Sequence, residues 1–173
     1  MAYHFYASHL QLHLNQIRMA LLHLKLVLTT PMSGLSEIAI HALRKFFLLS
    51  LILENDIPSH LQAMMPADLQ TALTGILFAK YQRLVKLFVM QDIATFRKEM
   101  SIDATLETDG NMRLAQMTLI ALRRRLVLDV STRYRRIPLS ALMAILHDER
   151  VDETQRLVES LVRGPPFSTR LDR

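Results

Sequence analysis

The sequence predicts an all-α, mainly helical protein, and three observations support this prediction. Half of the 173 residues are apolar, whereas the chain contains only four Gly and six Pro, a composition that favours packed helices. Leu and Met, both strong helix formers, supply much of the apolar content. In several segments the apolar residues recur at every third or fourth position, which is the period of an amphipathic helix.

The first half of the chain has the pattern of paired helices. We expect helices over residues 3–14, 16–28 and 35–53. The segment 29–31 (Thr-Thr-Pro) ends the second helix, and Ser33 is the expected N-cap of the third. The run 46–53 is so apolar that the third helix should be central. The first two helices have the form of one unit of a helical-repeat array.

The middle of the chain continues with shorter helices. A short helix is expected over 60–65, and a helical pattern runs over 68–90 with a mild break at Gly75. Asp92 should cap a helix that ends near Met100, and residues 101–110 are expected to be a polar loop. An amphipathic helix follows over 111–130. Its expected buried stripe is Met112, Ala115, Leu119, Leu122 and Leu126.

The last forty residues differ in character. Helices are expected over 138–147 and 153–162, the second opened by a capping box of Asp152 and Gln155. Residues 167–171 have the alternation of one short strand. Helix, turn, helix and strand form the beginning of a winged helix. We therefore divide the chain into a helical-repeat part, 1–130, and an incomplete winged-helix part, 131–173.

The residue types argue against an enzyme and against a metal or other cofactor. The chain has no Cys and no Gly-x-Ser-x-Gly motif, so nucleophilic catalysis has little support. His9 and His13 have the spacing of two zinc ligands on one helix, but a general-base Glu and an obvious third ligand are missing. A helix-surface pair is the simpler interpretation. The acidic pairs near the start of the last helix are best explained as helix caps.

The strongest charge feature is a group of Arg residues in a chain of net charge +5. Its members are Arg123, Arg124, Arg125, Arg133, Arg135 and Arg136. Consecutive residues on a helix point about 100° apart, so the first three cannot form one tight patch. Three interpretations stay open: a solvated helix face, a contact with an acidic partner, and a nucleic-acid contact. The expected second winged-helix helix carries Glu153 and Glu159, which disfavours base recognition.

Nothing in the sequence indicates a membrane protein. Residues 1–10 lack the apolar stretch of a signal peptide, and the run 46–53 is far shorter than the ~20 residues of a membrane span. Together with the absence of Cys, this favours a soluble protein of a reducing compartment.

Several motifs resemble those of the PCI-domain family. They are Tyr81-Gln-Arg-Leu-Val-Lys-Leu-Phe, Asp92-Ile-Ala-Thr-Phe-Arg, Asp109-Gly-Asn-Met-Arg-Leu and Ile137-Pro-Leu-Ser-Ala-Leu. This family joins helical repeats, similar to tetratricopeptide repeats, to a winged helix in the proteasome lid, the COP9 signalosome and the translation initiation factor 3 complex. The segments Thr29-Thr-Pro-Met-Ser and Ala42-Leu-Arg-Lys-Phe-Phe-Leu-Leu-Ser-Leu-Ile-Leu resemble the third-subunit family of the signalosome.

The resemblance implies a non-catalytic scaffold subunit in the cytoplasm and nucleus. Its partners would be other signalosome subunits, the first and the eighth, in a complex that removes Nedd8 from cullin-RING ligases. Winged helices in such complexes align edge to edge, so the resemblance places Phe167, Thr169 and Leu171 at the seam. The alternatives are a PCI subunit of the lid or of initiation factor 3, and a nucleic-acid-binding PCI module. Family members are about twice as long, so we expect a fragment or a shortened variant.

Overall fold

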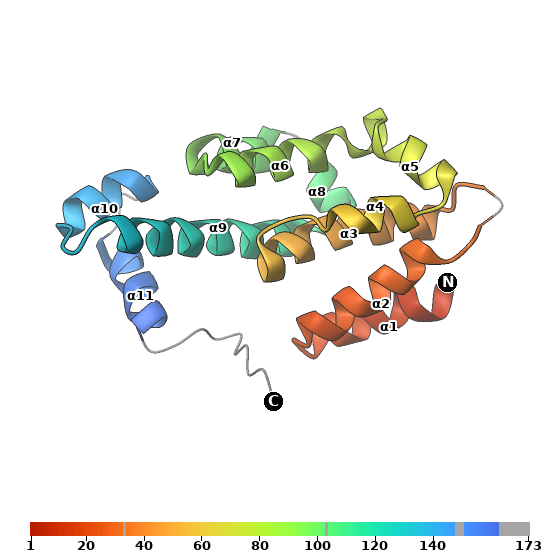
Figure 1. Cartoon of the computed structure of the whole chain (residues 1–173), viewed down its shortest axis with the longest axis horizontal. Coiled ribbons are helices and arrows are strands. Elements are labelled where there is room, and N and C mark those ends of the chain that lie inside the picture. The colour runs from red at the N-terminus through yellow and green to blue at the C-terminus, as the bar shows by residue number, and fades with distance from the viewer. Residues whose placement is uncertain (33, 103, 148–150, 163–173) are drawn as a thin grey trace. The chain divides into compact units, whose positions relative to one another are not determined.

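The computed structural model describes residues 1–32, 34–102, 104–147 and 151–162. Over these residues the regular secondary structure is helical, without a strand, which confirms the predicted all-α class (Figure 1). The expected strand at 167–171 lies outside the described residues.

The chain forms two compact units, Met1–Ala121 and Leu122–Arg173, and each is described by itself. The boundary falls within the longest helix, α9 (Met112–Arg133). The first turns of α9 therefore belong to the first unit and the later turns to the second. The division at residue 130 into a helical-repeat part and a winged-helix part stays a prediction.

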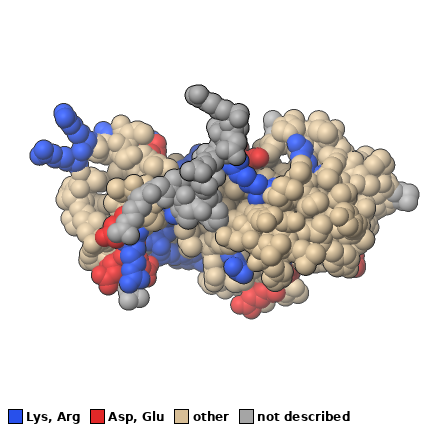
Figure 2. Space-filling view, turned by 90° about the horizontal axis from the view of Figure 1, so that it is seen from below, with Lys and Arg blue, Asp and Glu red and all other residues tan. Residues whose placement is uncertain are grey.

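The first unit begins with a helical hairpin. Its helices are α1 (Ala2–His13) and α2 (Ile17–Thr29), which lie side by side at the bottom of Figure 1. Figure 2 looks from below onto this region, where uncharged side chains cover most of the surface. The buried side of α2 consists of Ile17, Ala20, Leu24, Val27 and Leu28. Both helices confirm the sequence prediction to within two residues.

Helix α3 (Glu37–Glu54) is the centre of the first unit, as the run 46–53 predicts. Its N-cap is Ser36 and not Ser33, so α3 begins two residues later than expected. The residues of the run from Phe46 to Leu51 are all buried. Because α3 contacts both α2 and α6, it is apolar on most of its circumference.

The remaining elements of the first unit are short. They are α4 (Ser59–Met64), α5 (Ala67–Leu73), the 3₁₀ turn η1 (Ile76–Phe78), α6 (Ala79–Met90), α7 (Ile93–Ile102) and α8 (Thr105–Thr108). The break expected at Gly75 is complete, since a 3₁₀ turn separates α5 from α6. Asp92 caps α7 as predicted, its Oδ1 accepting the Thr95 N–H at 2.9 Å. The loop expected at 101–110 was wrong in part, because α7 extends to Ile102 and the buried Leu106 anchors α8.

The second unit contains the later turns of α9 with α10 (Leu139–Leu146) and α11 (Val151–Val162). Helix α11 begins before Asp152, so this residue lies in the first turn and is not the N-cap of the expected capping box. The buried positions of α9 also differ from the expected stripe, because Met112 and Leu119 are only half-buried. The buried residues of α9 are Leu114, Ala115, Thr118, Leu122, Leu126 and Val130.

A chain of buried polar contacts ties α3 to α6 and to the turn before α9. Arg44 Nη1 donates to Asp109 Oδ1 at 2.6 Å, and the Tyr81 hydroxyl donates to Asp109 Oδ2 at 2.6 Å. The same hydroxyl accepts from Asn111 Nδ2 at 2.8 Å, and Lys45 Nζ donates to Asn111 Oδ1 at 2.7 Å. We call these five residues the Asp109 network. It begins and ends on neighbouring residues of α3.

The network changes the acid–base properties of its members. Burial, followed by the hydrogen bond to Asp109, raises the pKa of Tyr81 well above its usual range, so its hydroxyl stays protonated. Burial lowers the pKa of Lys45, although Asp109 opposes this shift. The Asp109 side chain is only 6% exposed. Its charge is thus stabilised by Arg44 and Tyr81 instead of by water.

We expect Asp109→Ala to lower the free energy of unfolding by about 3 kcal/mol, because it leaves Arg44 and Tyr81 without their acceptor. Urea unfolding followed by circular dichroism measures this. The control is Glu107→Ala, which removes an exposed carboxylate from α8 and should cost less than about 0.5 kcal/mol. Equal effects of the two substitutions would contradict a structural role for the network.

His9 is a second polar group in the packing of the first unit. Its ring lies 4.7 Å, centroid to centroid, from that of Phe5. Burial lowers the pKa of His9, and the charges of Lys45, His13 and His41 lower it further. In the unfolded chain the imidazole has its ordinary pKa of 6.5. As the pH falls through this value, the unfolded state binds a proton that the folded state excludes, and stability is lost.

Lowering the pH from 8 to about 5 should therefore decrease the free energy of unfolding, and His9→Gln should make this decrease smaller. Urea unfolding of both proteins at a series of pH values measures the two slopes. If the free energy of unfolding depended on pH equally in both proteins, the burial of neutral His9 would not contribute to the loss of stability in acid.

Candidate protein-interaction sites

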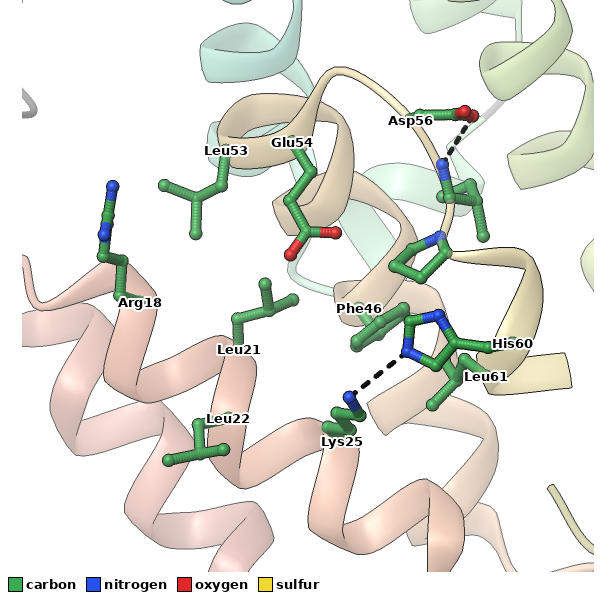
Figure 3. Close-up of a pocket in the computed structure, with 12 residues that line it drawn as sticks. Arg18, Leu21, Leu22, Lys25, Phe46, Leu53, Glu54, Asp56, His60 and Leu61 are labelled. Atoms are coloured by element: carbon green, nitrogen blue, oxygen red, sulfur yellow. Dashed lines mark hydrogen bonds between the residues drawn. The ribbon is translucent and has the colours of Figure 1, made fainter. Parts of the chain in front are cut away.

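A groove of about 720 Å³ opens between α2, the end of α3 and α4 (Figure 3). Its apolar lining includes Leu21, Leu22, Phe46, Leu53, Ile57 and Leu61. Phe46 and Leu61 are each 1% exposed, so they form the floor. The groove is within the size range of clefts that bind small molecules or the side chains of a partner.

The backbone at the end of α3 creates this groove. Asn55 adopts the left-handed conformation with φ of 58°, which ends α3 and turns the chain. Asp56 Oδ1 accepts the backbone N–H of Ile57 at 2.7 Å and fixes the connection. Pro58 then leads into α4, which lies beside α2 and closes the groove on that side.

Charged groups of both signs surround the groove. Helix α2 supplies Arg18 and Lys25, and Lys25 Nζ lies 3.4 Å from His60 Nε2 of α4. Glu54 extends from the end of α3 toward the space above Leu21, whereas the Asp56 carboxylate points away from it (Figure 3). An apolar floor with a charged rim suits the binding of an amphipathic segment.

Side chains that could bind a metal ion are not clustered in the described part of the chain. There, no three His, Asp or Glu side chains are close enough together to hold a metal ion. His9 and His13, the pair with zinc-ligand spacing, are thus not joined by a third ligand among these residues. Nor does any helix formed by the described residues have the length and hydropathy to cross a membrane.

The structure separates the Arg residues that the sequence analysis grouped. The Arg123 side chain is 13% exposed, and its Nη1 lies 3.9 Å from Glu153 Oε2 of α11. Arg124 Nη2 donates to Ser160 Oγ of α11 at 3.3 Å. Both side chains therefore contribute to the packing of α9 against α11 inside the second unit. Arg125 is half-buried.

The other members of the Arg group follow later. Arg133 pairs with Asp129 at 2.9 Å within α9. Arg135 and Arg136 are exposed in the connection to α10, so these two are the more accessible to an acidic partner. The expected partner-binding residues Phe167, Thr169 and Leu171 lie outside the described residues. Partner binding by any of these residues stays a prediction.

Sequence reasoning missed the groove. Its walls come from α2 and from the segment 53–61. Only tertiary packing brings these two segments together, and no local sequence pattern predicts it. The available signal was the polar connector Glu54-Asn-Asp-Ile-Pro directly after an apolar helix, since such a connector marks a sharp change of direction.

Residues 1–67 match the family model for the N-terminal helical repeats of COP9 signalosome complex subunit 3. A comparison with curated proteins found no match to the chain. The matched segment contains α1 to α4 and therefore the whole groove. Its paired helices are the architecture that a helical-repeat family requires. Over residues 1–67 the chain is thus similar to the N-terminal helical repeats of the third subunit of the COP9 signalosome.

Proposed function

We propose that the protein is a non-catalytic scaffold subunit of the COP9 signalosome. The observation that carries this proposal is the match of residues 1–67 to the helical repeats of subunit 3. Helical repeats stack into extended surfaces that bind partners, which suits a scaffold. The groove between α2 and α4, with its apolar floor and charged rim, is a surface of this kind.

In this proposal the chain positions other subunits of the complex and catalyses no reaction itself. The assembled complex removes Nedd8 from cullin-RING ligases in the cytoplasm and nucleus, and the first and eighth subunits are the neighbours of this chain. A PCI domain would extend over the remaining residues. The long helix α9 followed by the pair α10 and α11 is consistent with the start of a winged helix. Phe167, Thr169 and Leu171 would then pair with a neighbouring sheet edge.

A tagged pull-down from cell extract tests this proposal, with the co-purifying proteins identified by mass spectrometry. We expect signalosome subunits in near-equal amounts, because a scaffold subunit is a stoichiometric member of its complex. Recovery of proteasome-lid or initiation-factor 3 subunits without signalosome subunits would assign the chain to another PCI assembly and overturn the proposal.

Nucleic-acid binding is the alternative from another class, and the placement of the Arg residues argues against it. Arg123 and Arg124 engage α11, which leaves few cations for phosphates. We expect no salt-dependent binding of single-stranded RNA in fluorescence anisotropy at micromolar protein. Binding that falls with salt and disappears in the Arg135→Ala, Arg136→Ala variant would support the alternative. The matched control is Arg113→Ala, an exposed residue of α9 in the first unit.

A further inference from the structure

The charged groups around the groove alternate in sign along helix α2. Arg18 and Lys25 are two helical turns apart, so they lie on the same side of α2, about 10 Å from each other. The Glu54 carboxylate extends from the end of α3 toward the space above Leu21, which lies between these two cations along α2 (Figure 3). The order along the groove is therefore cation, carboxylate, cation.

These groups do not neutralise one another in the described part of the chain. Lys25 Nζ lies 3.4 Å from His60 Nε2, so its polar contact across the groove is with a second basic group. Neither the Arg18 nor the Glu54 side chain forms a hydrogen bond or an ion pair among the described residues. The remaining carboxylate of the lining, Asp56, points away from the groove and accepts a backbone N–H of the connection. Arg18, Lys25 and Glu54 are thus the charges that a partner in the groove has to match.

These three charges restrict the chemistry of the occupant. A wholly apolar segment would remove them from water without providing partners, which costs free energy. A uniformly acidic segment would place like charge beside Glu54, and a uniformly basic segment would place like charge beside Arg18 and Lys25. A segment with carboxylate, cation and carboxylate in this order complements all three.

We propose that the groove binds an amphipathic helix of a partner protein that carries an acidic, a basic and an acidic residue in this order along one flank. Flank residues of a helix recur every three or four positions, so a helix lying along α2 matches its positions 18, 21 and 25. The acidic residues pair with Arg18 and Lys25, and the basic residue pairs with Glu54. The apolar stripe of the helix covers Phe46 and Leu61 on the floor of the groove.

This inference rests on the proposed function in one respect, which is that the groove is an interaction surface. It does not depend on the identity of the complex. The pull-down identifies the complex that contains the chain, whereas binding of a purified peptide reports only on the groove, so the two proposals can fail separately.

A second copy of the chain is the other occupant to consider. Helix α11 has the complementary order of charges on its exposed side, in Asp152, Arg156 and Glu159. Its strongly exposed apolar residues lie only at its two ends, Val151 and Val162. Helix α11 therefore lacks the continuous apolar stripe that the floor of the groove requires, and we assign the groove to a partner.

The test uses the full chain and fluorescein-labelled helical peptides of about 18 residues, five turns long. Each peptide has Leu along one face and three variable residues along one flank, with the spacing of positions 18, 21 and 25. The first peptide has Glu, Lys and Glu at these positions, the second has Lys, Glu and Lys, and the third has Gln at all three. By fluorescence anisotropy we expect the Glu-Lys-Glu peptide to bind at least about tenfold more tightly than either of the others.

Reversing the charges of the groove should reverse this preference. The triple variant Arg18→Glu, Lys25→Glu, Glu54→Lys should bind the Lys-Glu-Lys peptide at least about tenfold more tightly than the Glu-Lys-Glu peptide. The matched control reverses three exposed charges of the first unit outside the groove, in the triple variant Lys86→Glu, Arg113→Glu, Glu107→Lys. The control should keep the preference of the unchanged chain. A control that reversed the preference as well would count against the groove as the site.

A second pair of variants locates the apolar contact. Leu22→Glu, in the wall of the groove, should weaken the binding of the Glu-Lys-Glu peptide at least about tenfold, whereas Ile76→Glu in η1 should not. Leu22 is 49% exposed and Ile76 is 93% exposed, so neither substitution buries a charge. Circular dichroism confirms that each variant keeps its helical content.

Three further results would overturn the proposal. They are equal binding of the three peptides, no binding of any of them, and a loss of binding that Ile76→Glu causes as strongly as Leu22→Glu. Sedimentation of the chain alone tests the second copy. A monomer supports the proposal, whereas an oligomer that Arg156→Glu dissociates would assign the groove to α11 of another copy.

Discussion

The burial of the Asp109 carboxylate is the constraint on which the first unit depends. A charge that is nearly removed from water requires partners that replace hydration, and Asp109 has Arg44 on one oxygen and Tyr81 on the other. Through Tyr81 the contacts continue to Asn111 and return to Lys45. Neighbouring residues of α3 therefore satisfy both ends of one network. This fixes the turn before α9 against α3 and α6 in a single arrangement.

Helix α3, which carries both ends of this network, also forms one wall of the groove beside α2 and α4. Helix α3 uses one side for the Asp109 network and α6, and another for the buried residues of α2. The side of α2 that borders the groove stays accessible between the end of α3 and α4. Packing of the buried side of α2 places Leu22 and Lys25 in the wall of the groove, where Lys25 Nζ lies 3.4 Å from His60 Nε2. Surfaces held by a rigid unit bind without the entropic cost of ordering flexible segments.

The sequence predicted most helices, because their apolar residues follow the helical period over long stretches. It also predicted the central position of α3 from the run 46–53 and the Asp92 cap from local chemistry. It did not predict the Asp109 network, since Arg44 and Asp109 are 65 positions apart and no local pattern connects them. The groove was missed for a similar reason, because Lys25 and His60 belong to helices that only tertiary packing joins.

The Arg group and the α1–α2 hairpin differ in how accessible their side chains are to a partner. Consecutive Arg residues are easily recognised in a sequence. In the structure, however, Arg123 and Arg124 have acceptors on α11. A charge that is already paired contributes less to the binding of a partner. Residues 1–36 attract less notice, with two permanent cations among many Leu residues. In the structure, Leu21 and Leu22 nevertheless line an open groove, and Arg18 and Lys25 of the same helix lie at its edge with Glu54 of α3. An accessible apolar lining with charged groups around it, more than the density of charge along the sequence, therefore identifies the part of the first unit that is suited to contact.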